Sequence, residues 1–593
     1  MSLVSQLSSF LSNNLQLRLR VTRNRVLPFR VQPCTDTIKA AAKLCSDEVI
    51  FRRSASYRPS KWDYQFIESL TSEYVGEPYT TRIEELKSEV KTKLERADND
   101  LHELEMIDTL QRLGVAYHFE DEIERALNSI YINPKNCRTK DLYATALEFR
   151  LLRQQGYNIN QEVFDSFKDE QGKFKACLCD DIKGLVCLYE ASFLSVRSDN
   201  ILDEAKDFAR KNLEIYVNEI KINGCNDSAY LFTLASHALE LPLHWRMQRS
   251  EAMWFIHVYE NNVPYDPIIL QFAKLDFNMV QAIHQQDLQH ATSWWKKMGL
   301  GEKLEFVRAR PMEGFLWTVG GVFEPEFGYF RRMLTRVGAL VTVIDDIYDV
   351  YGTLDELRLF TDVVVRWDIN AMEQLPHYMK ICFLALYNSI NEMAFDLLKD
   401  QGFDVIPFLK KGWADLCKSY LVEAEWYQNG YKPSMQEYLQ NGWISISAPL
   451  LLVHAYFTAT NQITDEASQC LKGYPEIVRS SSLITRLADD LATSSHEFTR
   501  GDNAKAMECY AHENGGSEAE ARDHVRALIS EEWKKMNEYA IGNTILSQTF
   551  IKMAKNLART SLCMYQFGDG FGAQNLETRN HVISLIIQPI PLS

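Results

Sequence analysis

Hydrophobic residues recur at helical spacing through most of the chain. One apolar stripe is closed by Gly114 and consists of Leu101, Leu104, Ile107, Leu110 and Leu113. A second starts after Asp141, a residue suited to cap a helix, ends at Gly156 and consists of Leu142, Ala146, Phe149 and Leu152. Intervals of three and four residues predict amphipathic α-helices. We find no alternating strand pattern and no fixed-period repeat, so the sequence predicts an all-α fold.

The helical pattern is interrupted at residues 260–267, where two prolines and two asparagines gather. Because these are loop residues, we place a domain boundary here, between an N-terminal helical domain at 52–265 and a C-terminal domain at 266–593. The first half carries little chemistry of its own. Its acidic pair Asp180-Asp181 lacks partner carboxylates and is typical of a helix start. We interpret the first half as a structural partner of the second.

The most unusual stretch is an apolar helix that ends in three carboxylates, Asp345, Asp346 and Asp349. Its apolar stripe is formed by Leu340, Ile344, Ile347, Tyr348 and Tyr351. We expect Gly352 to end this helix in the left-handed conformation. Thr353 and Glu356 are spaced as a capping box that starts the next helix.

Asp345 and Asp349 are four residues apart, so both project from the same face of the helix. Their mutual repulsion and the negative helix C-terminus together cost about 1 kcal/mol. A bound cation would offset this cost, and carboxylates with room for water and phosphate suit Mg²⁺. The alternative is an ordinary solvated acidic helix end, and this stretch alone does not decide between the two.

A second stretch places Asp489, Thr493 and Glu497 at intervals of four, which lines three oxygen ligands along one helix face. Two such helix ends can hold divalent ions between them and bind a diphosphate as the outer ligand of those ions. The alternative is a solvated polar face. Guanidinium and ammonium groups complement a diphosphate, and the candidates are Arg308, Arg310, Arg486 and Lys505. Each alone is typical of a surface ion pair, but as a set around carboxylates they indicate a phosphate site.

Composition narrows the possible partners. The 593 residues are 46% hydrophobic, which is ample for large cores. A net charge of −16 argues against nucleic acid or an anionic membrane as the main partner. The 12 cysteines show no metal-ligand spacing, so we interpret them as reduced, buried thiols. No run approaches the roughly 18 apolar residues that a membrane helix needs, which predicts a soluble protein.

The N-terminal segment differs in kind from the rest. From Met1 to Thr35 there is no Asp or Glu, the start is rich in serine, and the basic residues are Arg18, Arg20, Arg23, Arg25 and Arg30. This composition is typical of a transit peptide, which we assign to residues 1–51. The alternative is a disordered basic tail, and composition does not separate a plastid from a mitochondrial address.

Together these motifs resemble the plant terpene synthases, and most closely the angiosperm monoterpene synthases. The resemblance runs from about Arg52 to the C-terminus and rests on Arg52-Arg53 followed by Trp62, on Arg308-x-Arg310, on Asp345-Asp346-x-x-Asp349, and on Asp489, Thr493 and Glu497. It implies an N-terminal α-barrel-like domain without its own active site and a C-terminal class I terpenoid synthase α-bundle. It also implies that the leader is a cleaved plastid transit peptide.

The resemblance further implies that the enzyme, a monomer or weak homodimer, ionises geranyl diphosphate to diphosphate and an acyclic or cyclic C10 alkene or alcohol. Three Mg²⁺ ions, with Mn²⁺ as a substitute, would be held by Asp345, Asp349, Asp489, Thr493 and Glu497. The diphosphate would contact Arg308, Arg310, Arg486 and Lys505, and the residues expected to be catalytic are Asp345, Asp349, Arg308 and Arg486. Trp317, Tyr565 and Phe571 would line the pocket, and Arg52, Arg53 and Trp62 would lay the N-terminal strand over its mouth. From our own reading of the motif, we expect Asp346 to form a hydrogen bond or to pair with a basic neighbour, rather than to be an equal metal ligand.

Some residues depart from the family pattern. Ala309 stands where the family usually has Asp, and Phe567 and Phe571 stand where His is common. Gly314 costs a helix about 1 kcal/mol relative to Ala. These changes concern closure of the site and product outcome, and they leave all expected metal ligands in place.

Substrate size and three alternative functions complete the sequence-based picture. Isoprene synthases look to have Phe where this chain has Gly338 and Thr485, so small residues here favour the larger geranyl diphosphate.

A sesquiterpene or hemiterpene synthase is one alternative function. A chain-elongating prenyltransferase is another, although those enzymes generally carry two DDxxD boxes and no such N-terminal domain. The third is a non-catalytic binding protein descended from a synthase, a reading that only Ala309 favours.

Overall fold

The fold is described from a computed structural model, and it covers residues 52, 59–97, 99–133, 141–223, 229–262, 265–500, 505–572 and 575–592. For residues 223 and 494–500 only the helical backbone is described. Apart from one isolated bridge between Lys168 and Phe174, this part of the chain contains helices and no strand. The predicted all-α fold is therefore confirmed.

The helices before the predicted boundary are α1 (Tyr64–Glu68), α2 (Tyr79–Glu95), α3 (Asp100–Arg112), α4 (Glu120–Ile132), α5 (Leu142–Gln154), α6 (Ile182–Ser192), α7 (Asn200–Asn223), α8 (Ala229–Glu240) and α9 (Gln248–Glu260). After it come α10 (Pro267–Met298), α11 (Leu300–Lys303), α12 (Pro311–Gly321), α13 (Gly328–Asp346), α14 (Leu354–Arg366), α15 (His377–Gln401), α16 (Ile406–Asn429), α17 (Met435–Ser445), α18 (Ala448–Ala459), α19 (Asp465–Lys472), α20 (Glu476–Arg500), α21 (Ala506–Asn514), α22 (Glu518–Gly542), α23 (Gln548–Met564) and α24 (Leu576–Val582). Short 3₁₀ turns are η1 (Ala116–Phe119), η2 (Gln161–Phe167), η3 (Ala176–Asp180), η4 (Leu243–Trp245), η5 (Pro325–Phe327) and η7 (Ile369–Gln374), and π turns are η6 (Ile347–Tyr351) and η8 (Ile583–Ile587).

Several predicted helix ends are confirmed. Gly114 and Gly156 have φ values of 76° and 92°, the left-handed conformation that ends a helix. Asp141 caps α5 by accepting the Tyr143 N–H, and Asp181 caps α6 in the same way. Thr353 and Glu356 form the expected capping box at α14.

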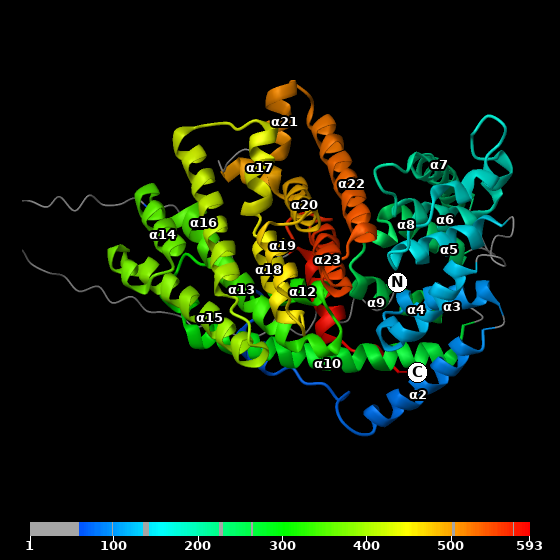
Figure 1. The fold of residues 1–593 in the computed structure, drawn as a ribbon, viewed down its shortest axis with the longest axis horizontal. Coiled ribbons are helices and arrows are strands. Elements are labelled where there is room, and N and C mark those ends of the chain that lie inside the picture. Colours follow the sequence, from blue (N-terminus) through cyan, green and yellow to red (C-terminus); the bar gives the residue numbers. More distant parts are fainter. Residues whose placement is uncertain are drawn as a thin grey trace, which may run out of the picture. The chain divides into compact units, whose positions relative to one another are not determined.

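The long helix α10 runs beneath the N-terminal helices and beneath the C-terminal bundle (Figure 1). Asp266 caps it by accepting the N–H groups of Ile268 and Ile269, and Pro267 occupies its first turn, where no N–H is needed. The predicted interruption at 260–267 therefore falls between α9 and α10. The domain limits 52–265 and 266–593 stay a prediction, because apolar residues of α10 and α12 belong to the core of the first half.

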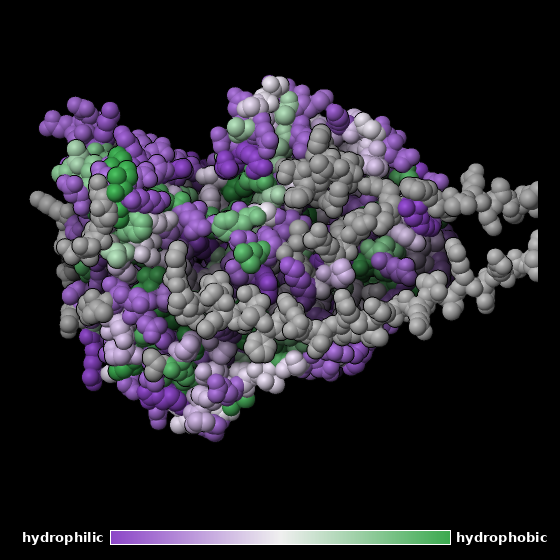
Figure 2. Space-filling view, turned by 180° about the vertical axis from the view of Figure 1, so that it is seen from behind, coloured by the Kyte–Doolittle hydropathy of each residue, from purple (hydrophilic) through white to green (hydrophobic). Residues whose placement is uncertain are grey.

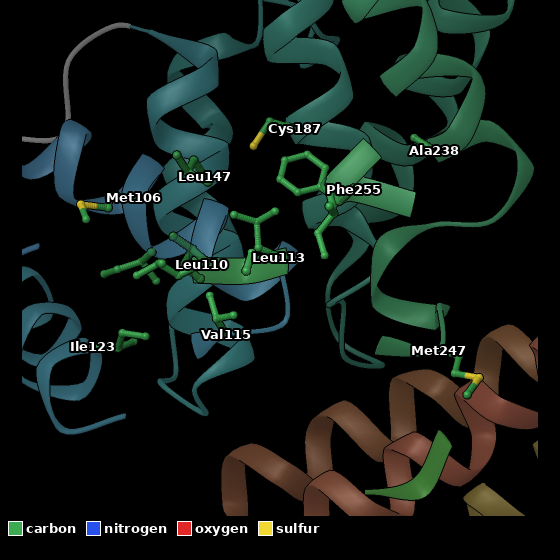
Figure 3. Packing of buried hydrophobic residues seen from close by; sticks show 14 of the residues in the cluster. Met106, Leu110, Leu113, Val115, Ile123, Leu147, Cys187, Ala238, Met247 and Phe255 are labelled. Atoms are coloured by element: carbon green, nitrogen blue, oxygen red, sulfur yellow. The ribbon is translucent and has the colours of Figure 1, made fainter. Parts of the chain in front are cut away.

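The first core is built from α2 to α10 together with α12 and the C-terminal segment. Figure 3 shows Leu110, Leu113 and Val115 facing Leu147 and Phe255 across this core. Polar contacts tie the chain end to α10, since Asn278 donates to the Ile590 carbonyl at 2.8 Å and accepts its N–H at 2.7 Å. The last turns of the chain are thus held beside the helices that begin the bundle.

The second core fills the bundle around α13, α16, α18, α20, α22 and α23, with Trp413 and Trp533 fully buried. Burial on this scale stabilises the bundle strongly, at about 25 cal/mol for each Å² of apolar surface removed from water. The packing directs the C-terminal end of α13 and the middle of α20 toward one cavity.

Two stretches, His377–Gln401 and Met435–Ala459, are long and apolar enough to cross a membrane by length and composition, contrary to the sequence expectation. The second is interrupted at Ser447, where φ is 65°, and so forms two helices. Most of it is buried, and Phe383 and Ile390 of the first also pack into the second core. Packing in the interior of the bundle accounts for the apolar composition of the second stretch, whereas less than half of the apolar window in the first (44%) is buried. The face in Figure 2 is predominantly hydrophilic with scattered apolar residues.

The eight cysteines in the described part of the chain are all free. Four of them, Cys187, Cys382, Cys417 and Cys509, are buried, as expected for structural thiols. Cys177 is exposed because it lies on the surface turn η3, so the expectation of buried thiols holds only in part.

Candidate active site

The end of α13 differs from the prediction for Gly352. Its φ is −75°, so it does not have the left-handed conformation. The helix instead widens into the π turn η6, and the Gly352 N–H donates to the Ile347 carbonyl at 2.8 Å. A Cβ at Gly352 would lie 2.9 Å from that carbonyl oxygen and 2.6 Å from Leu357. Glycine is therefore required by close approach rather than by φ. The π turn alters which side chains share a face beyond Asp346.

Arg308 bridges the first two carboxylates of this helix end. Its Nη2 pairs with Asp345 Oδ2 in a short contact, and its Nε lies 2.8 Å from Asp346 Oδ1. The Arg308 backbone N–H also donates to Asp346 Oδ2 at 2.7 Å. Asp346 is fully buried, which raises its pKa to about 7 although Arg308 acts in the opposite direction. Its expected pairing with a basic neighbour is confirmed.

Arg486 on α20 makes the same bridge at the second motif. Its Nη2 pairs with Asp489 Oδ2 in a short contact, and its Nε lies 3.1 Å from Asp490 Oδ1. Asp490 is fully buried and accepts the Tyr438 hydroxyl at 2.7 Å and the Ala506 N–H at 3.2 Å. The buried carboxylate therefore joins α17, α20 and α21 beneath the second motif.

Two further expected ligands, Asp349 and Thr493, have described side chains. Asp349 reaches the surface of the cleft, but the surrounding protein partly desolvates its carboxyl group. This desolvation and the nearby carboxylates of Asp345 and Glu423 raise its pKa well above the ordinary value. Thr493 donates its hydroxyl to the Asp489 carbonyl at 3.0 Å. Burial raises the pKa of Glu423 as well, and the Lys505 ammonium opposes the upward pKa shifts of both Asp349 and Glu423. The Glu497 side chain lies outside the described residues.

These residues fit a divalent cation. Their donors are carboxylate and hydroxyl oxygens, the ligands of hard ions, and crowded carboxylates with raised pKa values need positive charge. Among the described side chains, no three His, Cys, Asp or Glu residues stand close enough to enclose a metal ion by themselves. Oxygens from water and from a ligand must complete the coordination, as is usual for Mg²⁺.

A cavity of about 180 Å³ borders Arg308, the arginine that pairs with Asp345. Its lining is mostly apolar and includes the predicted aromatics Trp317, Tyr565 and Phe571. The rings of Trp317 and Tyr565 meet edge to face, 5.8 Å apart between centroids. Arg308 and Arg310 also line the cavity, so its polar mouth and its apolar interior are continuous.

Arg310 links the first arginine motif to the C-terminal loop. Its guanidinium donates to the Ala309 carbonyl at 3.1 Å and to the Gly572 carbonyl at 3.2 Å. Burial lowers its pKa. The arginine therefore supports the turn that carries Phe571 into the cavity lining. Phe567 is exposed and is not part of that lining.

The N-terminal segment reaches the end of the first motif through Arg52. The guanidinium donates to the Tyr351 carbonyl at 2.9 Å and to both oxygens of Glu356 at 2.8 and 2.9 Å. It also lies 4.5 Å from the ring centre of Tyr351 and 4.9 Å from that of Tyr378. Burial would raise the pKa of Glu356, but Arg52 and the Thr353 N–H bring it down to about 2. A lid role stays a prediction, since Arg53 lies outside the described residues and Trp62 packs against Phe66 and the first core.

Three residues of the site were missed from the sequence. Glu423 on α16 accepts the Ser445 hydroxyl at 2.6 Å and lies close enough to Asp349, the carboxylate of η6, to raise its pKa. Tyr438 holds Asp490, and the buried Tyr420 hydroxyl lies against Asp345. None of the three had a sequence signal. Their neighbour Asp490 did have one, because it repeats the Asp-Asp pair of the first motif. The others enter the site through packing of α16 and α17.

Comparison with known proteins places the chain in a family. Residues 61–239 match "Terpene synthase, N-terminal domain", and residues 296–535 match "Terpene synthase family, metal binding domain". A chloroplastic myrcene synthase from Quercus ilex is 56% identical over 96% of this chain and 94% of its own length.

Solved structures agree with this match. A limonene synthase with 2-fluorolinalyl diphosphate has a TM-score of 0.88 at 44% identity, covering 91% of this chain and all of that one (100%). An isoprene synthase from grey poplar, in complex with three Mg²⁺ ions and dimethylallyl-S-thiolodiphosphate, has a TM-score of 0.81 at 43% identity, covering 90% and 99%. The two matched domains and the metal-facing helix ends lead to one conclusion: this chain is an enzyme of the terpene synthase family.

Proposed function

We propose that this enzyme is a monoterpene synthase that ionises geranyl diphosphate. One observation carries the proposal: an apolar, aromatic-lined cavity is bordered by Arg308, which pairs with Asp345, and by Tyr565, which lies close to Asp489 of the second acidic segment. Such a site separates an anionic leaving group from a hydrocarbon chain. The similarity to myrcene and limonene synthases supports the same substrate class.

One set of residues would bind the metal ions and the diphosphate, and another lines the cavity for the hydrocarbon chain. Asp345, Asp349, Asp489, Thr493 and Glu497 would hold three Mg²⁺ ions, or Mn²⁺ in their place. When bound, these ions supply Lewis-acid stabilisation of the departing diphosphate. Arg308, Arg310, Arg486 and Lys505 would contact the diphosphate oxygens and hold the leaving group at the mouth.

The cavity then governs the fate of the allylic cation. The rings of Trp317, Tyr565 and Phe571 line the cavity, and an aromatic face stabilises a nearby cation by about 0.5–2 kcal/mol. The hydroxyls of Thr342 and Thr485, which line the cavity, donate to carbonyls of their own helices at 2.9 Å each. Their protons therefore already take part in hydrogen bonds within the protein. The apolar walls exclude bulk water until the carbon skeleton has rearranged or lost a proton.

Cavity size favours a ten-carbon substrate over a five-carbon one. Gly338 lines the cavity, and a Cβ built there would meet no atom within 4 Å. The space beside α13 is thus available to the substrate chain. Thr485, which also lines the cavity, is small as well.

We further propose that the mature enzyme acts in the plastid, as a monomer or weak homodimer. Residues 1–51 have transit-peptide composition, and the myrcene synthase of Quercus ilex is named as chloroplastic. A start near Arg52 would keep the Arg52 contacts with Glu356 and Tyr351.

The test is product formation by protein that starts near Arg52. Geranyl, farnesyl and dimethylallyl diphosphates are each supplied with Mg²⁺ or Mn²⁺, and the products are separated by gas chromatography. We expect the highest kcat/KM with geranyl diphosphate. Faster turnover of either of the other two substrates would refute the monoterpene assignment, and a longer product on addition of isopentenyl diphosphate would indicate a prenyltransferase.

A further inference from the structure

The two metal-facing segments carry the same four-atom bridge, although they share little other sequence. In each, an arginine joins the two aspartates of an Asp-Asp pair. Its outer nitrogen Nη2 pairs with the first, and its inner nitrogen Nε lies 2.8 or 3.1 Å from the second, a charge contact without hydrogen-bond geometry. The arginines differ in origin. Arg308 lies in the loop before α12, whereas Arg486 lies on α20 itself, one turn before its aspartates.

The two aspartates of each pair have different surroundings. The second ones, Asp346 and Asp490, have no exposed surface, and each also accepts a backbone N–H, from Arg308 and from Ala506 respectively. The first ones, Asp345 and Asp489, are partly exposed at the cleft. Burial therefore fixes the contact between Nε and the second aspartate. The contact between Nη2 and the first aspartate lies at the cleft, where a ligand can replace it.

We infer that Asp346 and Asp490 are positioning residues that hold the two arginines by Nε, so that each Nη2 can pass from the first aspartate to the diphosphate. Here Nη2 supplies the positive charge that Asp345 or Asp489 requires. Were that aspartate bound to a divalent ion, Nη2 would be available to a diphosphate oxygen without movement of the arginine stem. This inference rests on the proposed function, because it assigns the anion as a diphosphate.

The inference and net charge alone predict opposite effects on anion affinity when a buried aspartate is neutralised. Removing a buried negative charge beside an arginine should strengthen anion binding if charge alone matters. If the carboxylate positions the guanidinium, its removal should weaken anion binding. Removing the first aspartate, in contrast, should strengthen metal-free diphosphate binding, because it releases Nη2.

The experiment measures the Kd of inorganic diphosphate by calorimetry, with EDTA present and no metal. We expect Asp345→Asn and Asp489→Asn each to bind diphosphate about tenfold more tightly than the wild type, the gain of one charged hydrogen bond. The matched control is Asp349→Asn. It removes the same charge one turn away, but Asp349 pairs with no arginine among the described residues, so its gain should stay below about twofold.

The buried aspartates are tested on the tighter-binding background. Adding Asp490→Asn to Asp489→Asn should weaken diphosphate binding by about tenfold. Tyr438→Phe, which keeps every charge and removes one hydroxyl from Asp490, should weaken it in the same direction. Asp287→Asn, which unpairs Arg331 and Arg332 at the far end of α13, should lower Tm without changing the diphosphate Kd.

Each result decides the inference. Tighter binding on adding Asp490→Asn, or a gain for Asp349→Asn equal to that for Asp345→Asn, would overturn it in favour of net charge. If the Asp490 variant does not fold, the inference is still tested by Tyr438→Phe and by the comparison of Asp349→Asn with Asp345→Asn. The readout needs no turnover, so a failure here is distinct from a failure to convert geranyl diphosphate.

Discussion

At the scale of single residues, the site is governed by which carboxylates are buried and which are open. Asp346 and Asp490 are fully buried and paired, and Asp345, Asp349 and Asp489 reach the cleft. The sequence presents these residues as two identical Asp-Asp pairs. Their division of roles follows from the helix face each one occupies.

Asp345→Ala should nearly abolish turnover of geranyl diphosphate with Mg²⁺ while leaving the fold intact. Loss of one metal ligand removes about 3 kcal/mol or more of transition-state stabilisation, which lowers kcat at least about a hundredfold. Glu497→Ala should behave alike. Diphosphate release is the assay, with Asp355→Ala as control because Asp355 is 93% exposed at the start of α14. Activity within a few-fold of the wild type for Asp345→Ala would remove it from the ligand set.

Gly338→Phe should exclude geranyl diphosphate and spare dimethylallyl diphosphate. The new ring would enter the cavity from α13, where a Cβ meets nothing within 4 Å. We expect kcat/KM for geranyl diphosphate to fall about tenfold or more, equivalent to at least about 1.4 kcal/mol. Gly542→Phe, at the exposed end of α22 and outside the lining, is the control. Unchanged selectivity would mean that the substrate does not occupy this part of the cavity.

At the scale of elements, helix ends decide where the chemistry sits. The caps at Asp141, Asp181 and Thr353 could be predicted because side chain and backbone interact within three residues. The end at Gly352 could not, since it depends on the contact with Leu357 and on the π turn η6. The Arg52 contact with Glu356 spans some three hundred residues (|i−j| = 304) and has no local signal.

Glu356→Gln should loosen the N-terminal segment without unfolding α14. Glutamine can still complete the capping box, but it loses the charge that binds Arg52, a partly buried contact worth about 1–2 kcal/mol. We expect kcat/KM to fall several-fold and the segment before Trp62 to be cleaved faster by trypsin, with Tm almost unchanged. Trypsin sensitivity equal to that of the wild type would show that this ion pair does not hold the segment.

At the scale of the whole molecule, two cores meet along α10, and the first contains a buried charge network. Glu251 on α9 pairs with Arg112 on α3 at 2.9 Å and with His237 on α8 at 2.7 Å. Burial alone would raise the pKa of Glu251, but Arg112 and His237 bring it down to about 2. These contacts join three helices far from the active site.

This network should make stability fall in acid. A carboxyl with a pKa of about 2 in the folded state and 4.5 when unfolded binds its proton more readily in the unfolded chain. Its stabilisation, about 3 kcal/mol, is complete above about pH 4.5 and is lost as the pH falls toward 2. We expect the Tm difference between wild type and Glu251→Gln to shrink from pH 6 to pH 3. A difference independent of pH would contradict the assignment to this carboxyl.

The sequence by itself determined the all-α class, the family and the residues of both acidic motifs, because helical periodicity, capping and ligand spacing act over a few residues. Only the tertiary structure decided that Arg308 and Arg486 bridge their motifs in the same way, that Glu423 and Tyr438 belong to the site, and that Gly338 opens into a cavity. These facts depend on contacts between helices distant in the chain, which packing of the two cores sets and which no local pattern encodes.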